Sequence, residues 1–263
     1  MSIGEPLKKG LSVATGSFPL LLVLFVFGLA WNLINIFYTP LTQNPAAGTS
    51  APVIAIGVVF ILLSIYVQAG SFGYVRDRIK SGAASLGSFG QGGAKYYLRM
   101  LGIGIIVALV VGLFVVAAAL IMAGLGRRSD QQALIGMWLA IVVAAIGIYV
   151  MMLMFLAPYV AVTDEQKVLA SIKKSIAFVR QNLLNVIVLG LILVVIGFVV
   201  GLALGALFAL LTAAVKGTPG DVIFAVISSF INSFLGLWVT GCFMTFYLNA
   251  SVNATNSNNT AGA

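Results

Sequence analysis

The 263-residue chain has no histidine, a single cysteine, and few charged residues, which make up only 8% of the sequence. Without histidine, the chain lacks the commonest metal ligand in proteins and the commonest general base at neutral pH. The one cysteine, Cys242, excludes an intramolecular disulfide. Hydrophobic residues make up 61% and the mean hydropathy is +1.14. So few polar side chains cannot cover a water-exposed surface, which excludes an ordinary soluble domain.

The apolar residues are gathered in six segments, each long enough to cross a bilayer as a helix, which takes about 20 residues. We therefore predict an all-α, polytopic membrane protein with one integral membrane domain over residues 1–250. The predicted spans cover about residues 17–38, 52–75, 98–125, 134–162, 183–215 and 222–247. The fifth is longer than a straight crossing needs, so we expect it to tilt, kink or project. Residues 251–263 are polar and uncharged, which predicts a disordered tail.

Residues 163–190, TDEQKVLASIKKSIAFVRQNLLNVIVLG, join the fourth and fifth apolar segments. Thr163 with Gln166 three residues later has the spacing of a capping box, which predicts a helix start. An apolar stripe follows at helical spacing: Val168, Ile172, Ile176, Val179 and Leu183. The cations fall mostly away from this stripe: Lys167, Lys173, Lys174 and Arg180. We interpret the segment as a basic helix on the membrane surface that bends into the fifth span near Asn182. The alternative is a solvated helix in a loop.

Basic, partly amphipathic segments also precede the first and third spans, so the chain has a weak internal repeat. This repeat predicts three helical hairpins, each with an interfacial helix before its odd-numbered span. The glycines before the third span weaken a helix there. The cations between the second and third spans that we expect to bind anionic headgroups or a partner are Arg76, Arg78 and Lys80.

The distribution of basic residues predicts the orientation. Eleven of the 14 Lys and Arg residues fall on one side of the predicted topology, and Arg127, Arg128 and Lys216 on the other. Basic loops stay in the cytoplasm, which places both termini there. Anionic lipid headgroups on that side are the expected partners, together with other membrane protein subunits. No basic run is accompanied by exposed aromatics, so a nucleic-acid partner is not expected.

The sequence around the fourth loop carries a resemblance to a known family. Pro158, Tyr159 and Val160 are followed by Asp164 and Glu165 and then by SIKKSIAFVRQNLLNVIVLGLILV. This pattern resembles the membrane domain fused to some bacterial glycerophosphoryl diester phosphodiesterases, and related six-span families of undefined function. The resemblance implies a bacterial or archaeal helical membrane protein, which we expect in the prokaryotic cytoplasmic membrane. It implies no activity, because the phosphodiesterase barrel with its metal-binding residues is absent.

No Asp, Glu, Lys or Arg lies well inside the apolar cores, and no phosphate-binding glycine loop occurs, so we predict no catalytic, metal or cofactor site. Glycines and alanine spaced by four indicate close helix packing, within this chain or against another subunit. These residues are Gly197, Gly201 and Gly205 in the fifth span, and Gly104, Ala108 and Gly112 in the third. Three amides are candidates for polar contacts in the membrane: Asn32, Gln68 and Asn232.

These observations favour a non-enzymatic membrane protein that acts by packing, as a scaffold, accessory or assembly subunit, or by contacting lipid. The alternative is a transporter or permease component for a neutral or lipid-like substrate, which the repeats and the long fifth segment favour. A midplane cavity lined by Asn32, Gln68 or Asn232 would support transport. An apolar outer face covered by another protein would support the scaffold.

Overall fold

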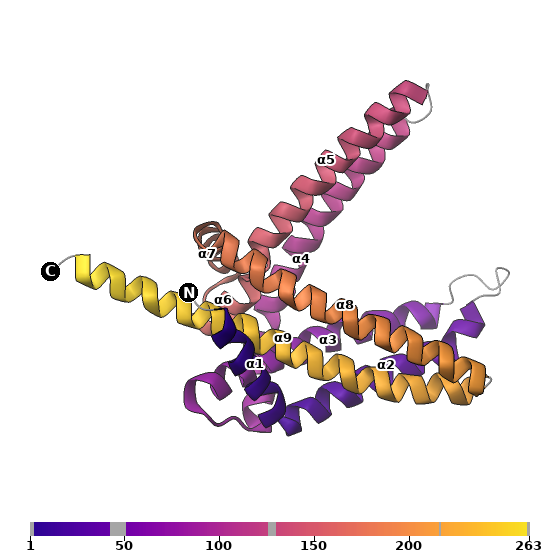
Figure 1. The fold of residues 1–263 in the computed structure, drawn as a ribbon, viewed down its shortest axis with the longest axis horizontal. Helices are drawn as coiled ribbons and strands as arrows, with labels where there is room; N and C mark the ends of the chain where they lie inside the picture. Colours follow the sequence, from indigo (N-terminus) through magenta and orange to yellow (C-terminus); the bar gives the residue numbers. More distant parts are fainter. Residues whose placement is uncertain (1–2, 43–50, 126–129, 216, 262–263) are drawn as a thin grey trace. The chain divides into compact units, whose positions relative to one another are not determined.

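The computed structural model describes residues 3–42, 51–125, 130–215 and 217–261, and every regular element in these ranges is a helix (Figure 1). Six helical segments are long and apolar enough to cross a membrane. The predicted fold class is therefore confirmed. The elements are α1 (Gly4–Gly16), α2 (Phe18–Thr42), α3 (Ala51–Ser81), α4 (Leu86–Leu125), α5 (Asp130–Met154), α6 (Ala157–Thr163), α7 (Val168–Gln181), α8 (Leu183–Ala214) and α9 (Thr218–Ala261).

The helices form two compact units. Unit 1 consists of Met1–Tyr97 and Leu184–Ala263, and unit 2 consists of Leu98–Leu183. Helix α4 begins in unit 1 and continues into unit 2. The single integral domain over residues 1–250 stays a prediction.

Helix α9 is the centre of unit 1, where it contacts α1, α2 and α3. Helix α1 lies directly on its backbone, as Figure 1 shows in indigo against yellow. A Cβ atom at Gly241 would lie 2.9 Å from the Cα of Gly10, so only glycines allow this crossing. The indole Nε1 of Trp238 donates a hydrogen bond to the Leu7 carbonyl at 3.1 Å. The amphipathic N-terminal segment is thus fixed to a spanning helix.

Helices α3 and α4 form a close hairpin in unit 1. A Cβ at Gly73 would lie 3.0 Å from the Cα of Gly92, and the ring of Tyr66 covers Gly93. The Tyr66 hydroxyl donates to the Gly90 carbonyl at 3.0 Å. The glycines that we expected to weaken a helix here instead permit contact between two helices. The segment before the third span is the start of α4 and not a separate helix, whereas α1 and α7 are separate helices.

In unit 2, α4 and α5 form a second hairpin, and α5 ends at Met154. Pro158 explains the break, because a proline in a helix interior has no amide to donate and clashes with the preceding turn. Helix α6 begins one residue before this proline and ends at Thr163. The prediction that Thr163 and Gln166 cap the next helix is wrong. Glu165 has a left-handed backbone (φ 54°), which stops α6, and the N-cap of α7 is Lys167.

The helix boundaries near Asn182 match the expected interruption, and those at the chain end differ from the expectation. Helix α7 ends at Gln181 with Asn182 as its C-cap, and α8 begins at Leu183, so the helix is interrupted at the residue where we expected a bend. Helix α8 has 32 residues, so at about 1.5 Å per residue it is roughly 48 Å long. Helix α9 continues to Ala261 through most of the segment expected to be disordered. Extending an existing helix costs far less than nucleating one.

Candidate functional site

Helix α7 separates its apolar and basic residues onto different faces. Ser171, Ile172, Ser175 and Val179 are buried, and Val168 and Ile176 pack beside them. The cations Lys167, Lys173, Lys174 and Arg180 are exposed. The apolar face packs on α5 and α6 of the same unit. The stripe that suggested insertion into lipid is therefore occupied by protein, and the outer face is basic.

The apolar face of α7 completes the core of unit 2. This core consists of Ile103, Met154, Ala157, Ala161 and Ile172. The Ser175 hydroxyl donates a buried hydrogen bond to the Leu153 carbonyl at 2.8 Å. That carbonyl lies at the end of α5, where the next turn is interrupted, so Ser175 supplies a donor at the break. Helix α7 is consequently an integral part of unit 2.

Among the described residues, Lys174 is the one α7 cation that forms an ion pair with the turn before the helix. Lys174 Nζ lies 2.8 Å from Asp164 Oδ2, with the carboxylate mostly covered. This pair ties the turn after α6 to α7. Lys167, Lys173 and Arg180 have no ion-pair partner within the described ranges of the chain. They remain available to bind anions.

The three predicted cations at the end of α3 lie in different environments. Arg76 is partly buried, donates to Asp77 Oδ1 from Nε at 2.9 Å and Nη2 at 2.8 Å, and also donates to the Tyr96 hydroxyl. Arg78 donates to the Gly82 carbonyl at 2.7 Å. Its guanidinium also lies beside Gly16, at the end of α1, where a cation complements the helix dipole. Of these three cations, Lys80 alone is exposed.

The predicted packing glycines face open space in their own units. Apart from its own helical turn, a Cβ at Gly197, Gly201 or Gly205 of α8 would have no atom of the described residues within 4 Å. The same holds for Gly104 and Gly112 of α4, and Ala108 between them is exposed. Packing within each unit does not use either stripe. The close contacts within the units use other glycines, notably Gly10, Gly73, Gly92 and Gly241.

The structure does not bring the three candidate amides together. Asn32 donates from Nδ2 to the Ser229 hydroxyl at 2.8 Å, which links α2 to α9. Gln68 and Asn232 are exposed on α3 and α9. Asn32 therefore acts as a contact between helices, which is the common role of an amide in the membrane.

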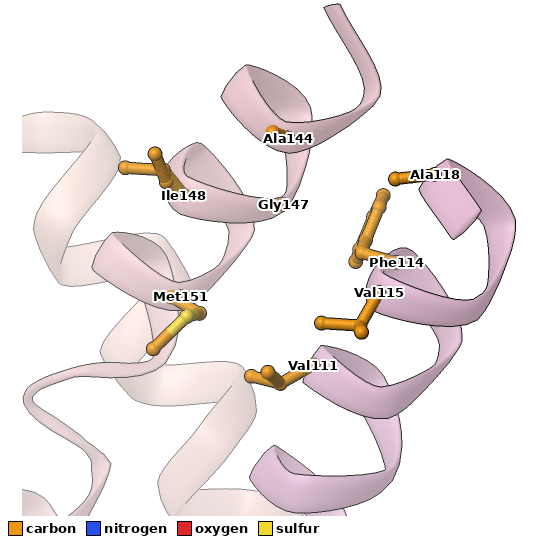
Figure 2. A pocket seen from close by; sticks show the side chains of 8 residues that line it. All are labelled: Val111, Phe114, Val115, Ala118, Ala144, Gly147, Ile148 and Met151. Carbon is orange, nitrogen blue, oxygen red and sulfur yellow. The ribbon is translucent and has the colours of Figure 1, made fainter. Parts of the chain in front are cut away.

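An apolar groove lies between α4 and α5 within unit 2. Its volume is about 300 Å³, and Figure 2 shows the labelled side chains of α4 directed toward α5. Phe114 packs over Gly147, where a Cβ would lie 3.0 Å from the ring. The lining residues are Val111, Phe114, Val115, Ala118, Ala144, Gly147, Ile148 and Met151. A groove of this composition offers dispersion contacts to an apolar chain and no group for chemistry.

A polar pocket of about 520 Å³ lies at the α3–α4 turn in unit 1. Sequence reasoning identified one of its residues, Lys80, and missed the others: Asp77, Ser81, Ala83, Ala84, Ser85 and Ser88. Ser85 was an available signal, because it directly precedes α4 and serine is a preferred N-cap residue. The hydroxyls of Ser85 and Ser88 accept hydrogen bonds from each other's backbone amides at 3.3 Å.

Comparison with known proteins assigns a family and no activity. Among the described residues no group of three or more Cys, Asp or Glu side chains is arranged to hold a metal ion. No curated protein matches the chain, and no solved structure matches it. The resemblance to phosphodiesterase-associated membrane domains stays a prediction. One family model, described as a domain of unknown function (DUF7847), matches residues 1–250, and the chain belongs to this family.

Proposed function

We propose that this protein is a non-enzymatic scaffold or accessory subunit of a prokaryotic cytoplasmic membrane, with a basic surface that binds anionic lipid headgroups. Its six apolar helices are those of a multi-pass membrane protein. The bias of Lys and Arg toward alternate connections supports cytoplasmic termini. In that orientation α7 lies on the cytoplasmic side, where anionic lipids give the membrane surface a negative potential.

The observation that carries this proposal is the division of α7 into a buried apolar face and an exposed basic face. Because Ile172 and Ser175 fix the helix to unit 2, its cations are held in place on the outside. Each Lys or Arg near an anionic surface contributes about 1 kcal/mol of binding. The three cations without an ion-pair partner, Lys167, Lys173 and Arg180, therefore give a substantial preference for anionic lipid.

The bare small-residue stripe of α8 supports the scaffold part of the proposal. Gly197, Gly201 and Gly205 are exposed on one side of the helix, and unit 1 leaves them uncovered. Lipid tails cannot approach a helix backbone as closely as another helix with small residues can. We propose that another membrane protein subunit packs there.

The lipid part is tested by exchanging lipids into the purified full chain. Wild-type protein is equilibrated with vesicles of equimolar phosphatidylglycerol and phosphatidylcholine with matched chains, and the retained lipid is counted by native mass spectrometry. We expect phosphatidylglycerol to be preferred. The triple variant Lys167→Gln, Lys173→Gln and Arg180→Gln should lose that preference by about tenfold or more.

A charge-conserving variant provides the matched control. Lys167→Arg, Lys173→Arg and Arg180→Lys change the same side chains but keep all three charges, so the preference should persist. If the neutral variant retains as much phosphatidylglycerol as the wild type, α7 is not a lipid-binding surface and the proposal fails.

A further inference from the structure

We infer that the polar pocket at the α3–α4 turn binds the headgroup of a zwitterionic phospholipid that carries a phosphate and a primary ammonium. This inference does not rest on the proposed function, because the pocket belongs to unit 1 and α7 belongs to unit 2. The pocket has a volume of about 520 Å³ and opens to the surface, which suits a polar headgroup.

The pocket lies at the depth of lipid headgroups. The apolar run of α3 ends at Val75, and Lys80 follows five residues later. At about 1.5 Å per residue, Lys80 is roughly 7 to 8 Å beyond the apolar run. A bilayer has a hydrocarbon core of about 30 Å within a total of about 40 to 45 Å, so each headgroup layer is about 5 to 8 Å thick. With the edge of the hydrocarbon core taken at the end of the apolar run, we infer that the side chains of the pocket meet headgroups and not acyl chains.

The pocket offers one cation and several acceptors. Lys80 is exposed and has no ion-pair partner among the described residues, so its ammonium is available to a phosphate. The hydroxyl proton of Ser81 is directed to the carbonyl of Asp77 or Ala83, at 2.6 and 2.7 Å. The Ser88 hydroxyl donates a hydrogen bond to the Ser85 carbonyl at 2.7 Å. These oxygens keep lone pairs that accept hydrogen bonds.

Asp77 completes the match to a primary ammonium. Its Oδ1 accepts both hydrogen bonds from Arg76, and no hydrogen bond to its Oδ2 forms within the described residues. An ammonium group has three N–H donors, which suits a carboxylate oxygen beside serine acceptors. A quaternary ammonium has no N–H and therefore cannot donate hydrogen bonds to these carboxylate and serine oxygens. A phosphate on Lys80 with a primary ammonium on Asp77 satisfies both charged ends of the pocket.

The test measures headgroup preference of the full chain in nanodiscs made from equimolar phosphatidylethanolamine, phosphatidylcholine and phosphatidylglycerol with matched chains. Lipid that stays bound on transfer to detergent is counted by native mass spectrometry. We expect phosphatidylethanolamine to be enriched over phosphatidylcholine about tenfold, equivalent to ~1.4 kcal/mol. Lys80→Gln and Asp77→Asn should each abolish that enrichment, and Lys8→Gln on the exposed face of α1 should leave it unchanged.

Asp77→Asn removes the carboxylate that pairs with Arg76, so it could disturb the fold. Ala84→Phe tests the pocket independently, because it fills the pocket without changing any charge. It should also abolish the enrichment, while thermal unfolding confirms that the variant is folded. Equal retention of the ethanolamine and choline lipids by the wild type, or unchanged enrichment in Lys80→Gln and Ala84→Phe, would overturn the inference. Tight binding of soluble glycerophosphoethanolamine in lipid-free micelles would also overturn it, by pointing to a free metabolite as the ligand.

Discussion

At the scale of single residues, glycines decide which helices touch. Gly10 and Gly241 bring α1 against α9, and Gly73 and Gly92 bring α3 against α4. None of these four belongs to the regular small-residue stripes visible in the sequence. A glycine used for one close crossing has no periodic signal, because the contact depends on where two distant segments meet. Sequence reasoning therefore identified the stripes and missed the crossings.

We predict that Gly10→Ala destabilises the protein. The new Cβ would lie 2.5 Å from Cys242 Sγ and 2.7 Å from the Cys242 backbone nitrogen, and backbone atoms cannot move aside cheaply. Overpacking of this kind costs about 1 to 3 kcal/mol. Thermal unfolding of the full chain in detergent should show a lower midpoint.

Gly236→Ala is the matched control for that prediction. Gly236 lies on α9, the helix that α1 contacts, but apart from its own helical turn a Cβ there would have no atom of the described residues within 4 Å. Alanine has the higher helix propensity, so the midpoint should stay or rise slightly. Equal effects of the two substitutions would show that α1 does not pack on α9 as described.

At the scale of elements, the sequence predicts which segments form helices better than it predicts the residues at which those helices begin and end. Six apolar segments predicted six spanning helices, and the change at Asn182 predicted where α7 gives way to α8. The start of α7 was predicted wrongly because Thr163 has suitable cap chemistry, while the left-handed turn at Glu165 has no sequence signal. The pattern of α7 was read correctly as amphipathic. Whether protein or lipid covers its apolar face could not be read from periodicity, which is the same in both cases.

We predict that Ile172→Ala lowers the stability of unit 2. Ile172 is 7% exposed and lies in the core with Ile103 and Met154. Truncating a buried isoleucine to alanine typically costs about 2 to 5 kcal/mol. If α7 only rested on lipid, the loss would be small, so thermal unfolding in detergent distinguishes the two arrangements.

Leu169→Ala supplies the comparison on the same helix. Leu169 is 65% exposed on the outer face, so its truncation should change the unfolding midpoint little. A larger loss for Leu169 than for Ile172 would mean that the outer face, and not the inner one, is packed.

At the scale of the whole molecule, each unit taken by itself leaves cations or small residues exposed. Unit 2 presents the exposed cations of α7, and unit 1 presents the glycines of α8. Arg76 shows why counting charges in the sequence does not identify a binding surface. It adds to the positive charge of the chain, but its guanidinium donates hydrogen bonds to Asp77 and Tyr96. The net charge follows from the sequence alone. Which of the cations are available to a ligand can be seen only in the folded structure.

The scaffold proposal is tested most directly by native purification in a mild detergent, with the mass of the particle and its components measured. We predict a stoichiometric additional subunit, either another protein or a second copy, that is lost in Gly201→Ile. Val195→Phe, which adds bulk on another exposed face of α8, should keep it. A lone monomer, unchanged in mass by Gly201→Ile and carrying a small-molecule substrate, would contradict the scaffold and favour transport.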